Sequence, residues 1–418
     1  MKPHSWWRLV TLIGLLAACG PSAAGTESPA TSHETVPIET APSSLPNAAF
    51  VSADGHLAVM RDGVMGTTLT GIVAADDKTV ISTTTTEGST TLSWIDLDDG
   101  TTTTSVDLAG DLRAMATDTT GRIVGLVSRD AAVGTSEIVI ASSAGERFRK
   151  SYDSELQPEG FSNAYEGELP SGMFVIEFLD SPSPDASAPR RYRVRVLGPS
   201  GGELSLPLNL RDKGQFVDEE MLGFSRSHVI SPANGLLFTL YRGVEADESN
   251  YAFVHTLGFV NGVWCLDLPS ELALERLPGA VILVDGEQKL LVVSSNGFVA
   301  EFVIDDITNP EHLPVPRRTQ VAWSTDTNSS APALAQRDGQ VLVGQGNTLR
   351  WIDAASLTGT VTQTVDIDIE AVALLADGEA VAAGAGRVAQ ISAAGQVGGT
   401  AQLPADLGAI SRVLTFGA

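Results

Sequence analysis

Short stretches of alternating apolar and polar residues, separated by Gly, Asn or Asp turns, fill most of the chain after residue 48. Two of these stretches, 333–353 and 372–392, align without a gap when Asp338-Gly339 is placed on Asp377-Gly378. In both, an apolar run ends in a tight turn, a second apolar run ends in small or polar residues, and a third run alternates. The pattern predicts repeated units of short antiparallel strands.

A third copy lies far upstream, because TLSWID at 91–96 matches TLRWID at 348–353. Units of about 40 residues with four strands each are typical of propeller blades, which bury their faces only against neighbouring blades. The repeat predicts seven windows: 72–108, 112–153, 157–210, 220–269, 278–319, 331–367 and 369–407. Residues 49–71 then supply about three strands of a closing blade and residues 409–418 supply its last strand.

The sequence therefore predicts an all-β fold, a β-propeller of four-stranded antiparallel blades. Eight blades are favoured, and seven is the alternative if residues 369–407 merge with the closing blade. The 41 glycines and 21 prolines agree with frequent turns, and no stretch after the N-terminus keeps a helical apolar period over three turns.

The first residues, MKPHSWWRLVTLIGLLAAC, have the pattern of a secretory signal, with Lys2 and Arg8 before an apolar run. The ending LAAC at residues 16–19 resembles the bacterial lipobox, in which the cysteine after the cleavage site becomes diacylated. We therefore expect a lipoprotein signal peptide at 1–18 and a lipid on Cys19, against the alternative of a plain signal peptide.

Residues 19–47 are rich in Pro, Ser, Thr and Ala and have almost no large apolar side chains. This composition predicts a disordered tether, followed by the propeller at 48–418, closed by the strand 409–418. The expected location is the outer side of the cell membrane, with the chain held there by the lipid on Cys19.

The chain is strongly acidic, with 51 Asp and Glu against 26 Lys and Arg, and a formal net charge of −25. Loss of residues 1–18 removes two of these cations, Lys2 and Arg8, and no acidic residue, so the mature chain is still more acidic. Such a surface repels nucleic acids and anionic headgroups, so no nucleic-acid partner is expected. Only Cys19 and Cys265 are cysteines, and this excludes a disulfide once Cys19 is lipidated, and any cysteine metal cluster.

The TLxWID units, with Trp94 and Trp351, resemble quinoprotein-like and WD40 (YVTN)-like propeller repeats. A propeller carried on a lipidated cysteine is also similar, in architecture and in expected cellular location, to the propeller lipoprotein of the bacterial outer-membrane assembly machine. The segment YAFVHTLGFVNGVWCLDLP at 251–269 is similar to uncharacterised actinobacterial propeller proteins. The first resemblance implies only the propeller framework of that family, and none of the three resemblances implies a particular chemistry.

Candidate catalytic and ligand motifs each have a simpler structural interpretation. His255 lies in an alternating strand and is expected to be a buried, hydrogen-bonded imidazole, while Cys265 is expected to be a buried small hydrophobe. Ser200, in GPSGG at 198–202, lies between two alternating runs, which predicts a hairpin and not a nucleophile elbow. DLDDG at 96–100 is expected to be a turn, and the polar stretches 180–187 and 243–249 are expected to be loops open to partners.

The segment AVAAGAGRVAQI at 380–391 spaces Gly384, Gly386 and Ala389 as a dinucleotide-binding loop does. Gly395, Gly398 and Gly399 interrupt the helix that such a loop requires, and the repeat aligns the segment with the turn around residues 345–350. The interpretation is a tight turn between strands, so no cofactor and no metal are expected.

These observations favour a membrane-anchored extracytoplasmic lipoprotein whose propeller binds or scaffolds a protein or other envelope partner, with no catalysis expected. Two alternatives stay open. One is a propeller hydrolase or lyase with acidic residues gathered at the central channel, and the other is an envelope assembly factor.

Overall fold

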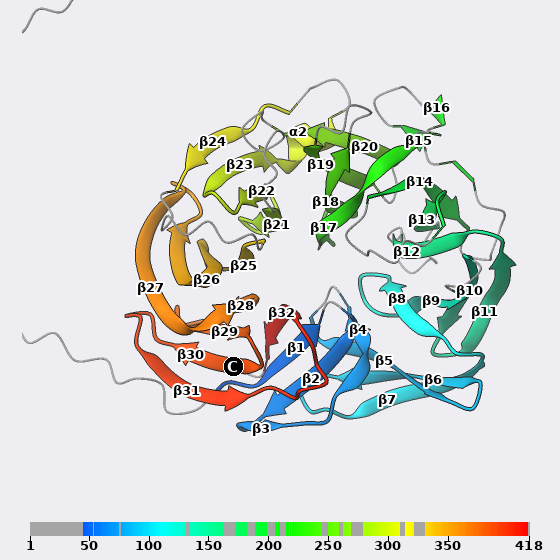
Figure 1. Cartoon of the computed structure of the whole chain (residues 1–418), viewed down its shortest axis with the longest axis horizontal. Coiled ribbons are helices and arrows are strands. Elements are labelled where there is room, and N and C mark those ends of the chain that lie inside the picture. Colours follow the sequence, from blue (N-terminus) through cyan, green and yellow to red (C-terminus); the bar gives the residue numbers. More distant parts are fainter. Residues whose placement is uncertain are drawn as a thin grey trace, which may run out of the picture. The chain divides into compact units, whose positions relative to one another are not determined.

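The computed structural model describes residues 45–416, except for 53, 75–76, 131–133, 162–171, 182–188, 199–204, 207, 210–214, 217, 219, 245–249, 259–261, 269–278, 310–313 and 322–330. All of these residues belong to one unit, 41–418. Its strands are antiparallel neighbours in sequence order, and they are arranged as blades around a centre (Figure 1).

Blade 1 combines segments from the two ends of the described chain. Its strands are β32 (Ile410–Thr415), β1 (Ala48–Ser52), β2 (His56–Arg61) and β3 (Val64–Met65). Blade 2 holds β4 (Leu69–Val73), β5 (Thr79–Thr86), β6 (Ser89–Asp96) and β7 (Thr102–Ala109). Blade 3 holds β8 (Arg113–Thr117), β9 (Ile123–Asp130), β10 (Thr135–Ser142) and β11 (Gly145–Tyr152). A short pairing between β2 and β4 joins blades 1 and 2 into one sheet.

Blades 4 and 5 also share one sheet. Blade 4 holds β12 (Glu155–Phe161), β13 (Met173–Phe178) and β14 (Arg190–Leu197), with an isolated bridge from Val196 to Ser205 in the place of a fourth strand. Blade 5 holds β17 (Met221–Ser231), β18 (Leu236–Val244), β19 (Asn250–Gly258) and β20 (Gly262–Asp267). Two short strands, β15 (Leu208–Asn209) and β16 (Gln215–Phe216), extend this sheet beyond β20.

The remaining blades follow the repeat closely. Blade 6 holds β21 (Gly279–Val284), β22 (Lys289–Ser294), β23 (Phe298–Val303) and β24 (Arg317–Gln320), with the single-turn helix α2 (Ile304–Thr308) between the last two. Blade 7 holds β25 (Ala333–Arg337), β26 (Gln340–Asp353) and β27 (Thr358–Ile369). Blade 8 holds β28 (Ala371–Leu374), β29 (Ala380–Gly384), β30 (Arg387–Ile391) and β31 (Val397–Gln402).

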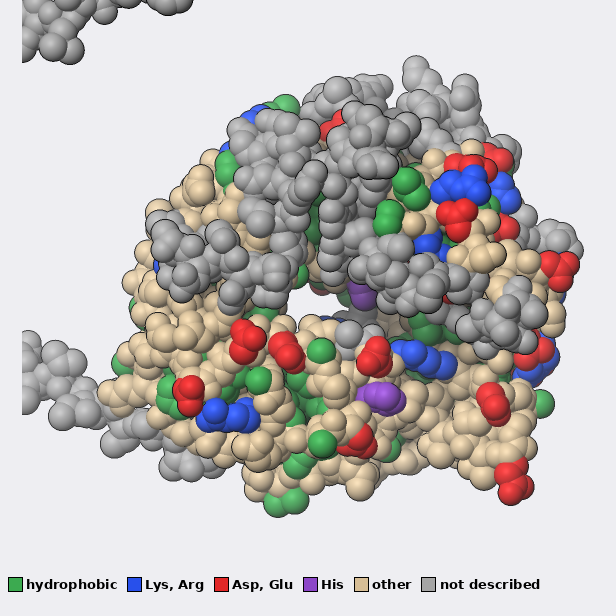
Figure 2. All heavy atoms as spheres, viewed as in Figure 1, with side chains coloured by type: hydrophobic (Ala, Val, Ile, Leu, Met, Phe, Trp, Pro, Cys, Tyr) green, Lys and Arg blue, Asp and Glu red, His purple; other side chains and the backbone are tan. Residues whose placement is uncertain are grey.

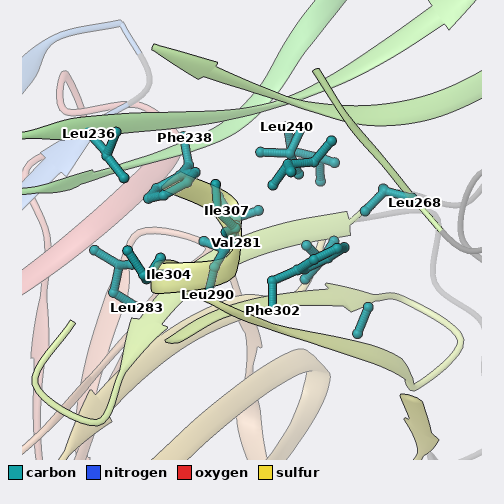
Figure 3. Packing of buried hydrophobic residues seen from close by; sticks show 14 of the residues in the cluster. Leu236, Phe238, Leu240, Leu268, Val281, Leu283, Leu290, Phe302, Ile304 and Ile307 are labelled. Atoms are coloured by element: carbon teal, nitrogen blue, oxygen red, sulfur yellow. The ribbon is translucent and has the colours of Figure 1, made fainter. Parts of the chain in front are cut away.

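Buried apolar side chains form eight clusters, and each cluster joins two successive blades. The cluster between blades 5 and 6, built on Phe238, Leu290 and Phe302, is a representative case (Figure 3). One cluster joins blade 8 to blade 1. There β32 also pairs with β1, and the paired residues run from Ala48 opposite Thr415 to Ser52 opposite Ile410. Since the core lies between blades and not within them, no blade is stable alone.

The β-propeller predicted from the repeat is confirmed, and the described strands group into eight blades. The two TLxWID tryptophans have the same role in their respective blades. The indole N–H of Trp94 donates to the carbonyl oxygen of Gly121 at 2.5 Å, and that of Trp351 donates to Gly378 at 3.3 Å. Each bond reaches a turn of the next blade, so the repeat in sequence is also a repeat in contacts between blades.

Blade 7 differs from the predicted pattern at one point. Residues 340–353 form one continuous strand, in which 340–344 pair with β25 and 346–353 pair with β27. The change of partner occurs at Gly346, whose φ of 55° lies in the left-handed region that glycine adopts without strain. One strand therefore serves as both middle strands of this blade.

Candidate functional site

The sector formed by blades 4 and 5 is where the chain departs most from its own repeat. The outermost full strand of blade 4, β14, pairs at Arg190–Tyr192 with the beginning of β17, the innermost strand of blade 5. Further along, β15 lies parallel to β20 through Asn209 and Val263, the one parallel pairing among the described strands. The chain between blades 4 and 5 thus crosses to the outer edge of blade 5 before it enters that blade.

Four arginines in β14 make ion pairs with carboxylates of blade 4 and of the crossing segment. The pairs join Arg190 to Glu155 at 2.9 Å, Arg191 to Asp180 at 2.8 Å, Arg193 to Glu177 at 2.7 Å, Arg195 to Glu177 at 3.0 Å and Arg193 to Asp218 at 3.4 Å. Blue and red side chains gather over this part of the ring in Figure 2, at the upper right. Each of these arginines has a carboxylate partner, so the network offers hydrogen-bonding groups at fixed positions.

Glu177 is the acceptor at the centre of this network. Burial opposes its ionisation, but the hydrogen bonds and positive charges of Arg193 and Arg195 outweigh burial and lower the pKa of the carboxyl group. Arg191 lies at the accessible edge, with its side chain 54% exposed and Glu220 at 3.6 Å as a second partner. This edge therefore presents a preformed array of hydrogen-bond donors and acceptors.

The face of blade 5 that packs on blade 4 carries a row of polar side chains. In strand register, His228 of β17 is opposite Thr239 of β18, Thr239 is opposite His255 of β19, and His255 is opposite Cys265 of β20. Residues paired in this way point to the same side of a sheet. The row runs from the innermost to the outermost strand of the blade, and around it lies an apolar cluster that includes Tyr241.

His255 lies in the middle of this row and is 2% exposed. Its ring meets that of Tyr241 edge-on, with centroids 5.6 Å apart, and that of Phe253 at 6.3 Å. Desolvation lowers the pKa of the imidazole to about 4, so the ring is neutral at neutral pH. The sequence-based expectation of a buried imidazole is right, and Nδ1 of His255 has no hydrogen-bond partner in the part of the chain that the structure describes.

The neighbouring groups are also desolvated. The pKa of Tyr241 is raised well above its usual value, first by burial and then by the negative charge of Glu159. Tyr192 of blade 4 stacks on Tyr241 at 5.1 Å between ring centroids. Cys265 packs against this cluster but is only partly buried, whereas the sequence predicted a buried residue.

His228 ends the row on β17, the innermost strand of blade 5 (Figure 1), and the space-filling view is hollowed at the centre of the ring (Figure 2). Its side chain is exposed, yet enough protein surrounds it that desolvation lowers the pKa of the imidazole, with the positive charge of Arg412 as the second cause. Arg412 of β32 is itself paired with Asp77 at 2.6 Å. The described residues contain no group of three or more His, Cys, Asp or Glu placed to hold a metal ion.

The other predicted motifs are turns or lie outside the described residues. Within DLDDG, Gly100 donates its N–H to the carbonyl oxygen of Asp96 at 2.8 Å and has φ of 75°, which confirms the turn. Ser200 and most of the polar stretches 180–187 and 243–249 lie outside the described residues, as do Cys19 and the first 44 residues. No helix in the described ranges is long and apolar enough to cross a bilayer.

The dinucleotide-like glycines of blade 8 form a hairpin, as the sequence predicts. Ala385 and Gly386, with φ of 49° and 73°, are the two central residues of the turn between β29 and β30. A Cβ on Gly384 would lie 2.0 Å from the carbonyl oxygen of Asp368. Glycine is required at this position because two backbone segments meet there, and the space that a pyrophosphate would need is filled.

Comparison with known proteins gives the fold class and no closer relationship. No protein-family model matches the chain, and no curated protein matches its sequence. Among solved structures, AztD from Citrobacter koseri is similar at 12% identity and a TM-score of 0.49, over 90% of this chain and 99% of that one. BamB from Moraxella catarrhalis is similar at 12% identity and a TM-score of 0.47, over 81% of this chain and 86% of that one. The class that the arrangement of the blades defines is that of the β-propeller proteins.

One sequence-based expectation is corrected at this point. Enzymes are among the structures that this chain resembles, namely hydrazine synthase from Kuenenia stuttgartiensis, with 11% identity and a TM-score of 0.41, and the dihydro-heme d1 dehydrogenase NirN, with 12% identity and a TM-score of 0.47. The expectation of no catalysis was wrong because it treated missing sequence motifs as evidence against an enzyme. A propeller assembles a site from several blades, and such a site has no local motif.

Proposed function

We propose that this chain is a lipoprotein on the outer side of the cell membrane, and that its propeller binds a protein partner through the blade 4–5 sector. The observation that carries the proposal is the crossing segment, which pairs β14 with β17 and places β15 beside β20. Blades 1 and 2 are also joined, through β2 and β4, but there the chain passes directly from one blade to the next. A departure from an otherwise regular pattern is expected where function overrides local preference.

The electrostatics of the sector support a protein partner. The arginines of β14 are held in fixed positions by carboxylates, so a partner gains directional hydrogen bonds without ordering long side chains. The chain as a whole carries a net charge of −25, which favours a partner with a positive surface and disfavours nucleic acids.

A charge reversal at the accessible edge tests the binding sector. Arg191→Glu removes the donors of Arg191 and places a negative charge beside Asp180 and Glu220, so the ion pairs that fix this edge are lost. We expect roughly tenfold weaker capture of the partner, which corresponds to about 1.4 kcal/mol, because the partner loses the fixed donors of this edge. The measurement is cross-linking and quantitative recovery of the partner from native membranes.

Arg387→Glu is the matched control, since Arg387 is an exposed arginine of blade 8 that also pairs with a carboxylate, Asp366, at 3.5 Å. It should leave recovery unchanged. Equal recovery with Arg191→Glu and with the unaltered protein would place the binding surface elsewhere on the ring.

The sequence features that support the lipid anchor are the leader and Cys19. Because the apolar run of the leader is about half of the ~20 residues needed to span a bilayer, the lipid is the attachment that we propose. Cys19→Ala should move the protein from the membrane fraction to the soluble fraction or the medium, as measured by fractionation and immunoblotting. Persistent membrane association of the Cys19→Ala protein would contradict the lipid anchor.

A further inference from the structure

The buried row of blade 5 holds more polar groups than its hydrogen bonds account for. Thr239 is 1% exposed and His255 is 2% exposed, and neither Oγ1 of Thr239 nor Nδ1 of His255 has a hydrogen-bond partner among the residues that the structure describes. A buried polar atom without a partner costs about 1–3 kcal/mol, and native proteins contain few of them. These two are neighbours on one sheet face, and Cys265 is next to His255 in the same row.

We propose that His255 and Cys265 form a binding site for one Cu(I) ion, with Thr239 beside it. The lone pair on a neutral imidazole nitrogen and the sulfur of a thiolate are both ligands for this ion, and soft sulfur ligands favour it over hard cations. His255 is buried, unpartnered at Nδ1, and on the same sheet face as the thiol, so the site does not depend on the cysteine alone.

The spacing of the two side chains suits a single bridging ion. Side chains opposite each other on antiparallel strands have Cβ atoms about 4.5–5.5 Å apart. Metal–nitrogen and metal–sulfur bonds of about 2.0 and 2.3 Å, which are the values for Zn²⁺, place one ion between such neighbours without moving the backbone. The edge-on contacts of the His255 ring with Tyr241 and Phe253 hold the ring in its orientation.

Charge selects a monovalent ion at this position. The cluster around His255 is apolar, and an unbalanced charge there would be strongly disfavoured. Cu⁺ with one thiolate is neutral, whereas Zn²⁺ with one thiolate leaves a positive charge and lacks its usual four ligands. The negative charge of Glu159, which reaches Tyr241, favours a bound cation over an anion.

Binding is an exchange of one proton for one metal ion. The S–H bond of Cys265 breaks, a Cu–S bond forms, and the proton leaves to solvent, so copper is supplied as Cu(I) and no electron is transferred. Cys265 is only partly buried and lies on the outermost full strand of the blade.

Competition against the Cu(I) complex of bicinchoninate tests the site. Every sample carries Cys19→Ala, which leaves Cys265 as the one thiol. We expect one equivalent of Cu(I) to be taken from the dye, and Cys265→Ser to abolish the uptake. His255→Gln should weaken it by more than the roughly 10–100-fold that loss of an outer-sphere partner costs.

A matched control and a second measurement keep the result interpretable. His228→Gln changes the exposed end of the same row and should leave Cu(I) affinity unchanged. X-ray absorption of the loaded protein should show one sulfur and one nitrogen neighbour. No uptake by the folded protein would overturn the proposal, as would uptake that survives Cys265→Ser or a spectrum without a sulfur ligand. Failure here leaves the proposed partner binding standing, because that function is tested at Arg191.

Discussion

Deletion of residues 409–418 is expected to unfold the propeller. The deletion removes β32, which pairs with β1 and buries Ile410, Val413, Leu414 and Phe416. Burial of such side chains contributes about 1.5–3 kcal/mol each, so the four together match the roughly 5–15 kcal/mol that stabilises a typical domain. Thermal unfolding followed by circular dichroism should show loss of the cooperative transition or a large fall in Tm.

The control for this deletion is a change on the same strand that spares the closure. Ser411 and Arg412 are exposed, and Ser411→Ala or Arg412→Ala removes a surface contact while the pairing and the buried side chains remain. Both should shift Tm only slightly, since surface pairs contribute about 0–1 kcal/mol. An unchanged Tm after the deletion would mean that blade 1 is not what closes the ring.

Acidification should destabilise the protein through His255. Its pKa is about 4 in the folded state against 6.5 as the ordinary value, so the unfolded state binds the proton more readily. The free energy of unfolding therefore falls as pH drops from 6.5 towards 4, by roughly 3 kcal/mol at 1.36 kcal/mol per pKa unit. Tyr241, whose ring meets that of His255 edge-on, has a raised pKa and therefore stays neutral in this range and does not offset the change.

Urea titrations at pH 4.5 and pH 7 measure the effect, with a chelator present. In His255→Gln the change in the free energy of unfolding between these two pH values should be smaller by about 2.4 kcal/mol, whatever the stability of the variant at neutral pH. His56→Gln, in blade 1, is the matched control and should keep the dependence of the unaltered protein. Parallel curves for His255→Gln and the unaltered protein would show that His255 is not protonated on unfolding.

The fold was readable from the sequence because a propeller repeats its local pattern. Each blade needs the same tight turns and the same apolar faces, so the alignment of 333–353 with 372–392 and the two TLxWID units indicated both the unit and its period. The hairpin at Ala385-Gly386 confirms the prediction for the most ambiguous motif, because the neighbouring repeat fixed its register.

The candidate site could be predicted from the sequence only in part. His255 and Cys265 were each recognised as strand residues, but their pairing across β19 and β20 depends on the hairpin register. The arginines of β14 stand out in sequence as a run of cations, whereas their partners come from β12, β13 and the crossing segment. The signal available in advance was the concentration of four cations in six residues of an acidic chain.

The sequence by itself determined the repeat, the strand-rich blades and the hairpin turns, because these depend on local backbone preference and on the period of apolar residues. The sequence also placed the strand 409–418 in the closing blade. Only the tertiary structure decided the rest: that β14 pairs with β17, that β15 lies beside β20, and that a histidine with no partner at Nδ1 lies beside the thiol. Those features join residues that are distant in the chain, and their energy comes from burial between blades, which has no period along the sequence.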